Sequence, residues 1–217
     1  AASDVYKRQG KSTVARGAAK QLGYIYVDTG ALYRAIGVNA LRNGVDTKDK
    51  AAVAASLDGV KVNLVFENGE QKVMLNGEDV SVEIRTPEAS MAASDVSAVP
   101  EVRAFLFNLQ RDIAKRNSCI MDGRDIGTVV LPQAQVKIFL TASPEIRAER
   151  RYKELIEKGS EVDYQSVLDD IVKRDYNDSH REIAPLKPAE DSVLFDTTGL
   201  ALDESVAAIT KIIKEKI

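Results

Sequence analysis

One short segment of the sequence carries residues whose types and order suit the binding of nucleotide phosphates. Gly10-Lys11-Ser12-Thr13 stands directly before a stretch, 14–22, that has the composition of a helix. In such a motif, backbone N–H groups, the lysine and the helix N-terminus bind phosphates, and the hydroxyl of the serine binds a magnesium ion. We therefore expect Gly10, Lys11, Ser12 and Thr13 to bind the phosphates of a nucleotide, with Ser12 also binding its metal.

The residues before this segment do not match the rest of the motif. The full pattern, G-x-x-x-x-G-K-[ST], has a glycine where this chain has Val5, and residues 1–9 lack the apolar run of a buried parallel strand. The peptide resembles the in-frame translation of a transposon-end sequencing adapter. We expect residues 1–9 to be a non-native scar that replaces the first strand and half of the loop, and the literal chain to be unstable or weakly active. A divergent natural N-terminus is the alternative.

A second segment, Asp28-Thr29-Gly30-Ala31-Leu32-Tyr33-Arg34, follows the short β-rich run 24–27. Ligands of open α/β sheets bind outside the carboxyl ends of the strands, so the hydroxyl of Thr29 and the guanidinium of Arg34 are well placed for an anionic substrate. Taken in isolation, Arg34 fits a solvated charge on a helix better than a ligand.

A third segment, 121–128, ends an apolar strand with two carboxylates, an arginine and two glycines. This composition packs poorly but suits a site at a strand tip. Asp122 is suited to hold magnesium through water, and the fork of Arg124 matches the geometry of a phosphate. A turn with solvated charges is the alternative.

A fourth segment, 174–181, contains two arginines, Arg174 and Arg181, seven residues apart. On a continuous helix they would lie about two turns apart and face the same way. Phosphoryl transfer needs positive charge around the transferred group, which two such arginines could supply. The alternative is a surface helix stabilised by i,i+4 ion pairs, which would show the same pattern. His180, the sole histidine, has no partner histidine, so we expect neither a metal site nor a general base there.

The composition is that of an ordinary globular protein. The chain has 217 residues, 44% of them hydrophobic and 29% charged, which suits one large α/β domain or one core with small insertions. A net charge of −3 favours neither nucleic acid nor a membrane surface as a partner, and one cysteine excludes an internal disulfide. With no apolar run near 18 residues and no secretory signal pattern, we expect a cytoplasmic enzyme.

The elements that must position these residues alternate along the chain. We expect strands at 24–27, 118–121, 136–140 and 192–195, and helices at 31–42, 102–116, 144–158, 164–175 and 201–216, an order that predicts a parallel sheet with helices on both faces. Alternating residues at 60–66 and 72–75, with Asn-Gly dipeptides after each, predict an antiparallel hairpin. An insertion of this size, together with a helical stretch after Pro87, indicates a functional sub-domain.

Taken together, the motifs resemble those of bacterial cytidylate kinases, the CMP-specific branch of the nucleoside monophosphate kinases. The segments that carry the resemblance are 26–30, 75–80, 84–87, 121–130 and 181–188, and it extends from Gly10 to the C-terminus. It implies an α/β fold of the P-loop nucleoside monophosphate kinase type: a parallel sheet with flanking helices, an NMP-binding insert and a lid. The implied bounds are 10–57, 100–150 and 181–217 for the core, 58–99 for the insert and 151–180 for the lid.

The resemblance also implies roles for individual residues. ATP and its Mg²⁺ would be bound by Gly10, Lys11, Ser12, Thr13 and Arg150, with Ser12 and Asp122 as the metal site. The substrate-binding set would be Thr29, Tyr33, Arg34, Ser94, Arg103, Arg124, Asp125, Arg174, Asp178 and Arg181. Within it, four arginines surround the phosphates (Arg34, Arg124, Arg174 and Arg181), and Asp178 binds the ribose hydroxyls. Lys11, Arg124, Arg174 and Arg181 would be catalytic.

Cytosine would be read by Ser94, Arg103 and Asp125. The carboxylate of Asp125 would accept from the 4-amino group, and Arg103 would donate to N3 and O2. Uracil would leave these groups mismatched, at a cost of about 1–3 kcal/mol for each buried unpaired group. No side chain has to act as nucleophile, because the acceptor is already a phosphate anion, so catalysis would be positioning and charge neutralisation.

The activity implied is transfer of the γ-phosphoryl group of ATP to CMP or dCMP by a monomer that binds neither nucleic acid nor a membrane. Two alternatives stay open. One is a non-catalytic nucleotide-binding module that kept the monophosphate site and lost ATP binding. The other is a nucleoside monophosphate kinase with another acceptor.

Overall fold

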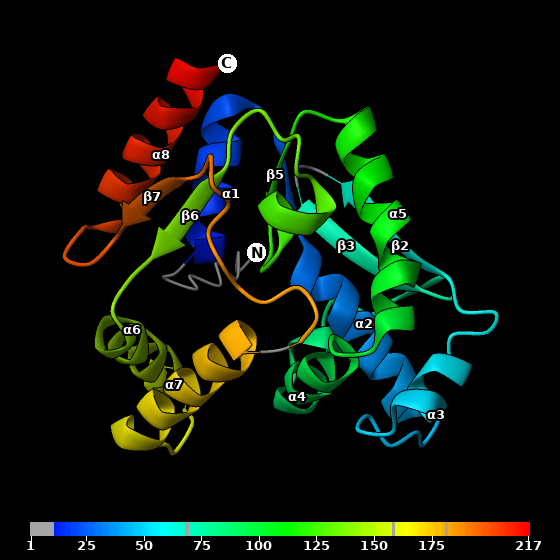
Figure 1. Ribbon diagram of the computed structural model, residues 1–217. Helices are drawn as coiled ribbons and strands as arrows, with labels where there is room; N and C mark the ends of the chain where they lie inside the picture. Colours follow the sequence, from blue (N-terminus) through cyan, green and yellow to red (C-terminus); the bar gives the residue numbers. More distant parts are fainter. Residues whose placement is uncertain (1–10, 68–69, 158, 181) are drawn as a thin grey trace. The chain divides into compact units, whose positions relative to one another are not determined.

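The computed structural model describes residues 11–67, 70–157, 159–180 and 182–217, which form two compact units (Figure 1). One unit is Tyr24–Gly123, and the other combines Ala1–Gly23 with Arg124–Ile217. The expected scar at 1–9, Gly10 and Arg181 lie outside the described residues.

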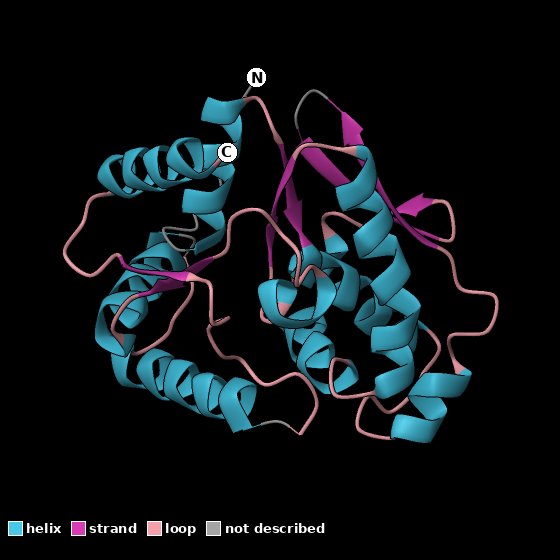
Figure 2. Ribbon diagram, turned by 45° about the horizontal axis from the view of Figure 1, so that its top comes forward, coloured by secondary structure: helices cyan, strands magenta, loops and turns pink. Residues whose placement is uncertain are grey.

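The Tyr24–Gly123 unit combines a parallel pair of strands, an antiparallel sheet and four α-helices among its described residues. Its elements are β1 (Ile25–Asp28), α2 (Thr29–Arg42), α3 (Lys50–Ala55), β2 (Val62–Glu67), β3 (Glu70–Leu75), β4 (Glu78–Asp79), the 3₁₀ turn η1 (Glu83–Arg85), α4 (Pro87–Val96), α5 (Pro100–Arg116) and β5 (Cys119–Asp122). Strands β1 and β5 pair in parallel, from Ile25 opposite Cys119 to Asp28 opposite Asp122. Strands β2, β3 and β4 form the antiparallel sheet, drawn in magenta in Figure 2.

Local sequence explains where the helices of this unit begin. Asp28 caps α2, because its Oδ1 accepts a hydrogen bond of 3.2 Å from the backbone nitrogen of Ala31. The hydroxyl of Thr86 caps α4 in the same way, and a proline occupies the first turn of both α4 and α5. The core of the unit then forms around α2, with Leu32 and Ile36 packed among residues of the hairpin, α4 and α5.

Helices α2 and α4 pack closely at Gly37, and lie side by side in Figure 1. A Cβ added at Gly37 would lie 2.8 Å from the Cβ of Ala92 and 3.1 Å from the backbone nitrogen of Ala93. Because the nearest atoms belong to the body of α4, they cannot rotate away. Only a residue without a side chain therefore fits at this crossing.

We expect Gly37→Ala to lower the free energy of unfolding by about 1–2 kcal/mol, since overpacking outweighs the gain in helix propensity. Urea denaturation measures the change. The compensating variant Gly37→Ala/Ala92→Gly removes the closest contact, so it should lose less stability than the sum of its two single variants. Strict additivity of the two changes would contradict close packing at this point.

The second unit contains one parallel pair of strands and four α-helices among its described residues. Its elements are α1 (Lys11–Leu22), the π-helix η2 (Ile126–Val130), β6 (Ile138–Thr141), α6 (Pro144–Glu157), α7 (Tyr164–His180), β7 (Val193–Asp196) and α8 (Leu202–Lys216). Strands β6 and β7 are parallel, α1 packs on α8, and α6 packs on α7. No described helix has both the length and the apolar character needed to cross a membrane.

The predicted α/β fold is confirmed: both two-stranded pairs are parallel, and helices flank them. The predicted strands and the hairpin also form, with shifts of one or two residues at their ends. Helix α7 continues to His180, beyond the predicted end at 175, and α3 was not predicted. The π-helix was also missed, where the backbone nitrogens of Val129 and Val130 both donate to the carbonyl of Asp125. The bounds of core, insert and lid stay predictions.

Candidate active site

The carboxyl ends of β1 and β5 bring together two residues of the predicted site, Thr29 and Asp122. Asp28 and Asp122 are opposite each other in the register of the two strands. The hydroxyl of Thr29 donates to the backbone oxygen of Asp122 over 2.8 Å, and the hydroxyl of Tyr26 lies 3.3 Å from Oδ2 of Asp122. Side-chain hydrogen bonds therefore join the ends of the two strands at the edge where α/β proteins bind ligands.

Arg34, the predicted phosphate ligand, is oriented by the same strand end. Its Nη2 donates to Oδ2 of Asp28 over 2.7 Å, and the side chains of the two residues are 14% and 23% exposed. Its Nε is buried and has no hydrogen-bond partner among the described residues. An unpartnered buried donor is costly, so the guanidinium is well prepared to receive an anion.

The predicted base-reading residue Arg103 lies next to Tyr33. The guanidinium carbon is 5.9 Å from the centre of the Tyr33 ring, and Nη1 donates to the backbone oxygen of Ser97 over 3.3 Å. Ser94 lies one turn before Ser97 on α4, and its backbone oxygen accepts from the hydroxyl of Ser97. Three substrate-binding residues that the resemblance implied are thus connected through α2, α4 and α5.

In the other unit, one carboxylate holds two of the predicted phosphate arginines. Oδ2 of Asp178 accepts a hydrogen bond of 2.6 Å from Nε of Arg124 and lies 3.9 Å from Nε of Arg174. Asp125, which follows Arg124, is 5% exposed and immediately precedes the π-helix. Such π-helical turns occur often at functional sites, because they change the direction of the chain next to the residues involved.

The residues predicted to bind ATP lie on two helices of this unit. Lys11, Ser12 and Thr13 form the first turn of α1. Arg150 is on α6, and its Nη2 lies 3.3 Å from the backbone oxygen of Thr197, just after β7. Arg150 therefore contacts the end of a parallel strand.

The residues proposed for the metal have the chemistry that magnesium requires. Ser12 offers a hydroxyl oxygen and Asp122 a carboxylate oxygen, and hard oxygen ligands are those that Mg²⁺ prefers. In the part of the chain that the structure describes, no group of three or more His, Cys, Asp or Glu side chains could hold a metal. Few protein ligands are needed, since Mg²⁺ usually keeps several waters and binds substrate phosphates.

Cys119, the sole cysteine, is not suited to nucleophilic catalysis. Burial raises the pKa of the Cys119 thiol above its ordinary value, so the reactive thiolate is scarce at neutral pH. A reaction that needs no protein nucleophile is consistent with this environment.

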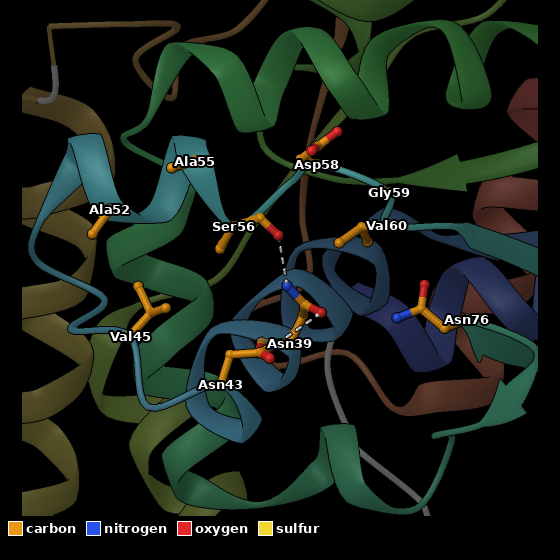
Figure 3. A pocket seen from close by; sticks show the side chains of 10 residues that line it. All are labelled: Asn39, Asn43, Val45, Ala52, Ala55, Ser56, Asp58, Gly59, Val60 and Asn76. Carbon is orange, nitrogen blue, oxygen red and sulfur yellow. Dashed lines mark hydrogen bonds between the residues drawn. The ribbon is translucent and has the colours of Figure 1, made fainter.

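A surface pocket lies elsewhere on the Tyr24–Gly123 unit, at the far end of α2 (Figure 3). Asn39 and Asn43 line it, together with residues of α3 and the turn that follows, and the side-chain amide of Asn39 donates to the backbone oxygen of Ser56. Asn39 is ten residues from Thr29, about 15 Å along a helix. None of the predicted site residues lines this pocket, so we do not assign the nucleotide to it.

Two residues of the site were missing from the predicted set. Asp28 orients Arg34, and its position before a helix is a recognisable N-cap signal. Gln71 on β3 hydrogen-bonds to the main chain of Asp28. In the sequence, Gln71 appears only as a polar residue in the alternating pattern of a hairpin strand. The sequence alone does not show that this residue contacts the end of a distant strand.

Parallel strands with Thr29 and Asp122 at their carboxyl ends, together with Lys11, Ser12 and Thr13 at the start of α1, are typical of a nucleotide-binding α/β protein. The family model described as cytidylate kinase matches residues 6–215. The chain therefore belongs to the cytidylate kinase family.

Curated relatives agree with this assignment over nearly their whole length. A cytidylate kinase of Caldicellulosiruptor bescii is 48% identical over 212 residues, which cover 96% of this chain and 94% of that protein. A cytidylate kinase of Lactobacillus johnsonii is 52% identical over 207 residues, which cover 95% and 90% of the two chains. The corresponding enzyme of Carboxydothermus hydrogenoformans is 49% identical, with coverage of 95% and 93%.

The aspartates of α7 allow a matched test of this site. We expect Asp178→Asn to raise the KM for CMP about tenfold, because Arg124 and Arg174 lose the charge that orients them. Asp169→Asn is the control, because Asp169 lies on the same helix, is exposed and accepts a hydrogen bond from Gln165 of that helix. Steady-state kinetics with varied CMP measure both, and equal effects of the two variants would contradict a specific role for Asp178.

Proposed function

We propose that this chain transfers the γ-phosphoryl group of ATP to CMP or dCMP, giving CDP or dCDP and ADP. The observation that carries this proposal is the match to cytidylate kinases along 95% of the chain at about half identity. The orientation of Arg34 by Asp28 supports it, since an arginine at the end of a parallel strand suits the phosphate of a nucleoside monophosphate.

In this proposal, the residues of α1 serve the donor. Lys11 neutralises charge on the ATP phosphates, and Gly10 and Thr13 of the same sequence motif would bind them as well. Arg150 is the further ATP-binding residue. Ser12 and Asp122 would hold Mg²⁺, which when bound supplies charge neutralisation on the phosphates.

The phosphates would be surrounded by arginines from different elements. Arg34 binds the acceptor phosphate, and Arg124, Arg174 and Arg181 neutralise charge that develops on the transferred group. The contacts of Asp178 support this, because Arg124 and Arg174 both lie near its carboxylate, which helps to position them. A site arranged in advance loses less free energy to reorganisation during the reaction.

Cytosine would be recognised by Asp125, Arg103 and Ser94. Asp125 is 5% exposed, and its carboxylate would accept a hydrogen bond from the 4-amino group of cytosine. Arg103 is held by Ser97 and Tyr33, so it can donate to the ring acceptors from a fixed position. Asp178 would bind the ribose hydroxyls. We further propose that the protein acts as a monomer in the cytoplasm.

The lid helices α6 and α7 would exclude water while the phosphoryl group is transferred. Arg147 of α6 pairs with both carboxylate oxygens of Asp175 on α7, so the two helices are joined as one piece. We therefore propose that they move together when the site closes.

Acceptor specificity tests the proposal. Initial rates with CMP, dCMP, UMP and AMP at fixed ATP should give kcat/KM for CMP at least tenfold above UMP, as expected for mismatched buried polar groups. Asp125→Asn should reduce this preference. Higher kcat/KM with AMP or UMP would favour a kinase with another acceptor, and tight CMP binding without ADP release would favour a non-catalytic module.

A further inference from the structure

Gln71 is a polar residue on the buried face of the hairpin. Gln71, Val73 and Leu75 alternate along β3 and so share one face of the strand. Val73 and Leu75 are 1% and 2% exposed and belong to the core of their unit. An amide on this face needs hydrogen-bond partners, because burying a polar group without them costs free energy.

The partner of Gln71 is the main chain of Asp28. The backbone nitrogen of Asp28 donates to Oε1 of Gln71 over 2.8 Å, and Nε2 of Gln71 lies 3.3 Å from the carbonyl oxygen of Asp28. One side-chain amide thus satisfies both main-chain groups of the residue, as a neighbouring strand would. It does so at the residue where β1 ends and α2 begins.

The side chain of Asp28 continues this connection to Arg34. Oδ1 accepts from the backbone nitrogen of Ala31, and Oδ2 accepts from Nη2 of Arg34 over 2.7 Å. A Cβ added at Gly30 would lie 3.1 Å from Oδ1 of Asp28 and 3.2 Å from Nη1 of Arg34, so the loop is closely packed around the pair. The position of the guanidinium therefore depends on where the main chain of Asp28 is held.

We propose that Gln71 is a positioning residue for the acceptor-phosphate site: Gln71 holds the main chain of Asp28, and Asp28 holds Arg34. The inference rests on the proposed function, in which Arg34 binds the phosphate of CMP. Gln71 itself touches no phosphate. Through this contact the hairpin sets the position of Arg34, which lies on α2. A small displacement of a phosphate-binding side chain is enough to weaken binding of the phosphate.

Gln71→Met tests the proposal, because methionine has a similar length and neither hydrogen bond. We expect the KM for CMP to rise about tenfold, while the KM for ATP stays unchanged. Lys72→Met is the matched control: Lys72 is the next residue on β3, points to the opposite face and pairs with Glu67. Its KM for CMP should stay within twofold of the unaltered chain, about the scatter of a surface substitution.

A second measurement separates positioning through Arg34 from a general loss of structure. CMP binding measured by titration calorimetry in Arg34→Met and in Gln71→Met/Arg34→Met should give the same affinity, because Gln71 acts only through Arg34. A further loss in the double variant, or equal rises in the KM values for CMP and ATP, would overturn the proposal.

Failure of the proposed function can be told apart from failure of this inference. If the unaltered chain prefers UMP or AMP, the CMP assignment fails, while the same Gln71→Met effect on the KM of that acceptor would support the positioning role. If CMP is the preferred acceptor and Gln71→Met behaves like Lys72→Met, the positioning role fails and the proposed function stands.

Discussion

Lys11→Met is expected to lower kcat for CMP phosphorylation about 10²–10³-fold, the loss typical when one preorganised charge or donor at a transferring group is removed. Lys11 is the first residue of α1, where we propose that the helix N-terminus and the lysine together attract the phosphates of ATP. No side chain acts as nucleophile in the proposed reaction, so charge neutralisation accounts for most of the rate enhancement. Removal of the Lys11 charge should therefore lower kcat. Quenched assays of ADP formation at saturating CMP measure the loss.

Lys20→Met is the control for this prediction. Lys20 lies on the same helix, in its last turn, and is exposed, so its removal changes net charge equally without touching the phosphate end. CMP binding measured by calorimetry should be unaffected by either variant. A kcat that survives Lys11→Met would contradict the role of α1 in binding ATP.

Arg34→Met is expected to raise the KM for CMP about 100-fold, with a smaller change in the KM for ATP. A charge-assisted hydrogen bond contributes about 1.5–3 kcal/mol, and an arginine fork can make two of them to one phosphate. The variant also leaves the carboxylate of Asp28 without its partner, which adds repulsion toward the incoming anion. Steady-state kinetics with varied CMP at saturating ATP measure the change.

Arg42→Met provides the matched comparison on the same helix. Arg42 pairs with Glu78 and Glu83 at the exposed end of α2, where ion pairs contribute little to stability. Its KM for CMP should equal that of the unaltered chain. A similar rise of the KM for CMP in both variants would show that the effect comes from a general change in α2 and not from loss of the proposed phosphate contact of Arg34.

The sequence predicted the fold well where the pattern was local. Strand-like runs such as 24–27 end at polar residues, and the parallel pairing of β1 with β5 follows from their alternation with helices. Alternating apolar and polar residues and two Asn-Gly dipeptides indicated the hairpin. Asn76, in the second dipeptide, adopts a positive φ of 51°. These signals are contained within a few residues, so they depend little on contacts with distant segments.

What the sequence could not predict depends on contacts between distant segments. In the π-helix after Asp125, Gly127 lies close to the side chain of Lys137. The Nζ of Lys137 in turn donates to the carboxylate of Asp191. No hydrophobic periodicity in the sequence predicts this arrangement. The link from Gln71 to Asp28 joins a hairpin to a strand end 43 positions away. The roles of Arg103, Asp125 and Asp178 came from the resemblance to a family, since spacing alone indicated only a small phosphate-binding kinase.

The departure of residues 5–9 from the phosphate-binding motif makes turnover by this chain the decisive question. The residue at the position of the first motif glycine is Val5, while Lys11 and Ser12 keep their place at the start of α1. A matched variant that supplies an apolar strand and a glycine in place of residues 1–9 should therefore gain activity over the chain as it stands.

The most direct measurement is ADP release with ATP and magnesium, in the presence and absence of CMP, on the chain with its present N-terminus. The account predicts CMP-dependent ADP release that UMP supports at least tenfold less well. No CMP-dependent release from either this chain or the variant with a restored loop would contradict the assignment of this protein as a kinase acting on CMP.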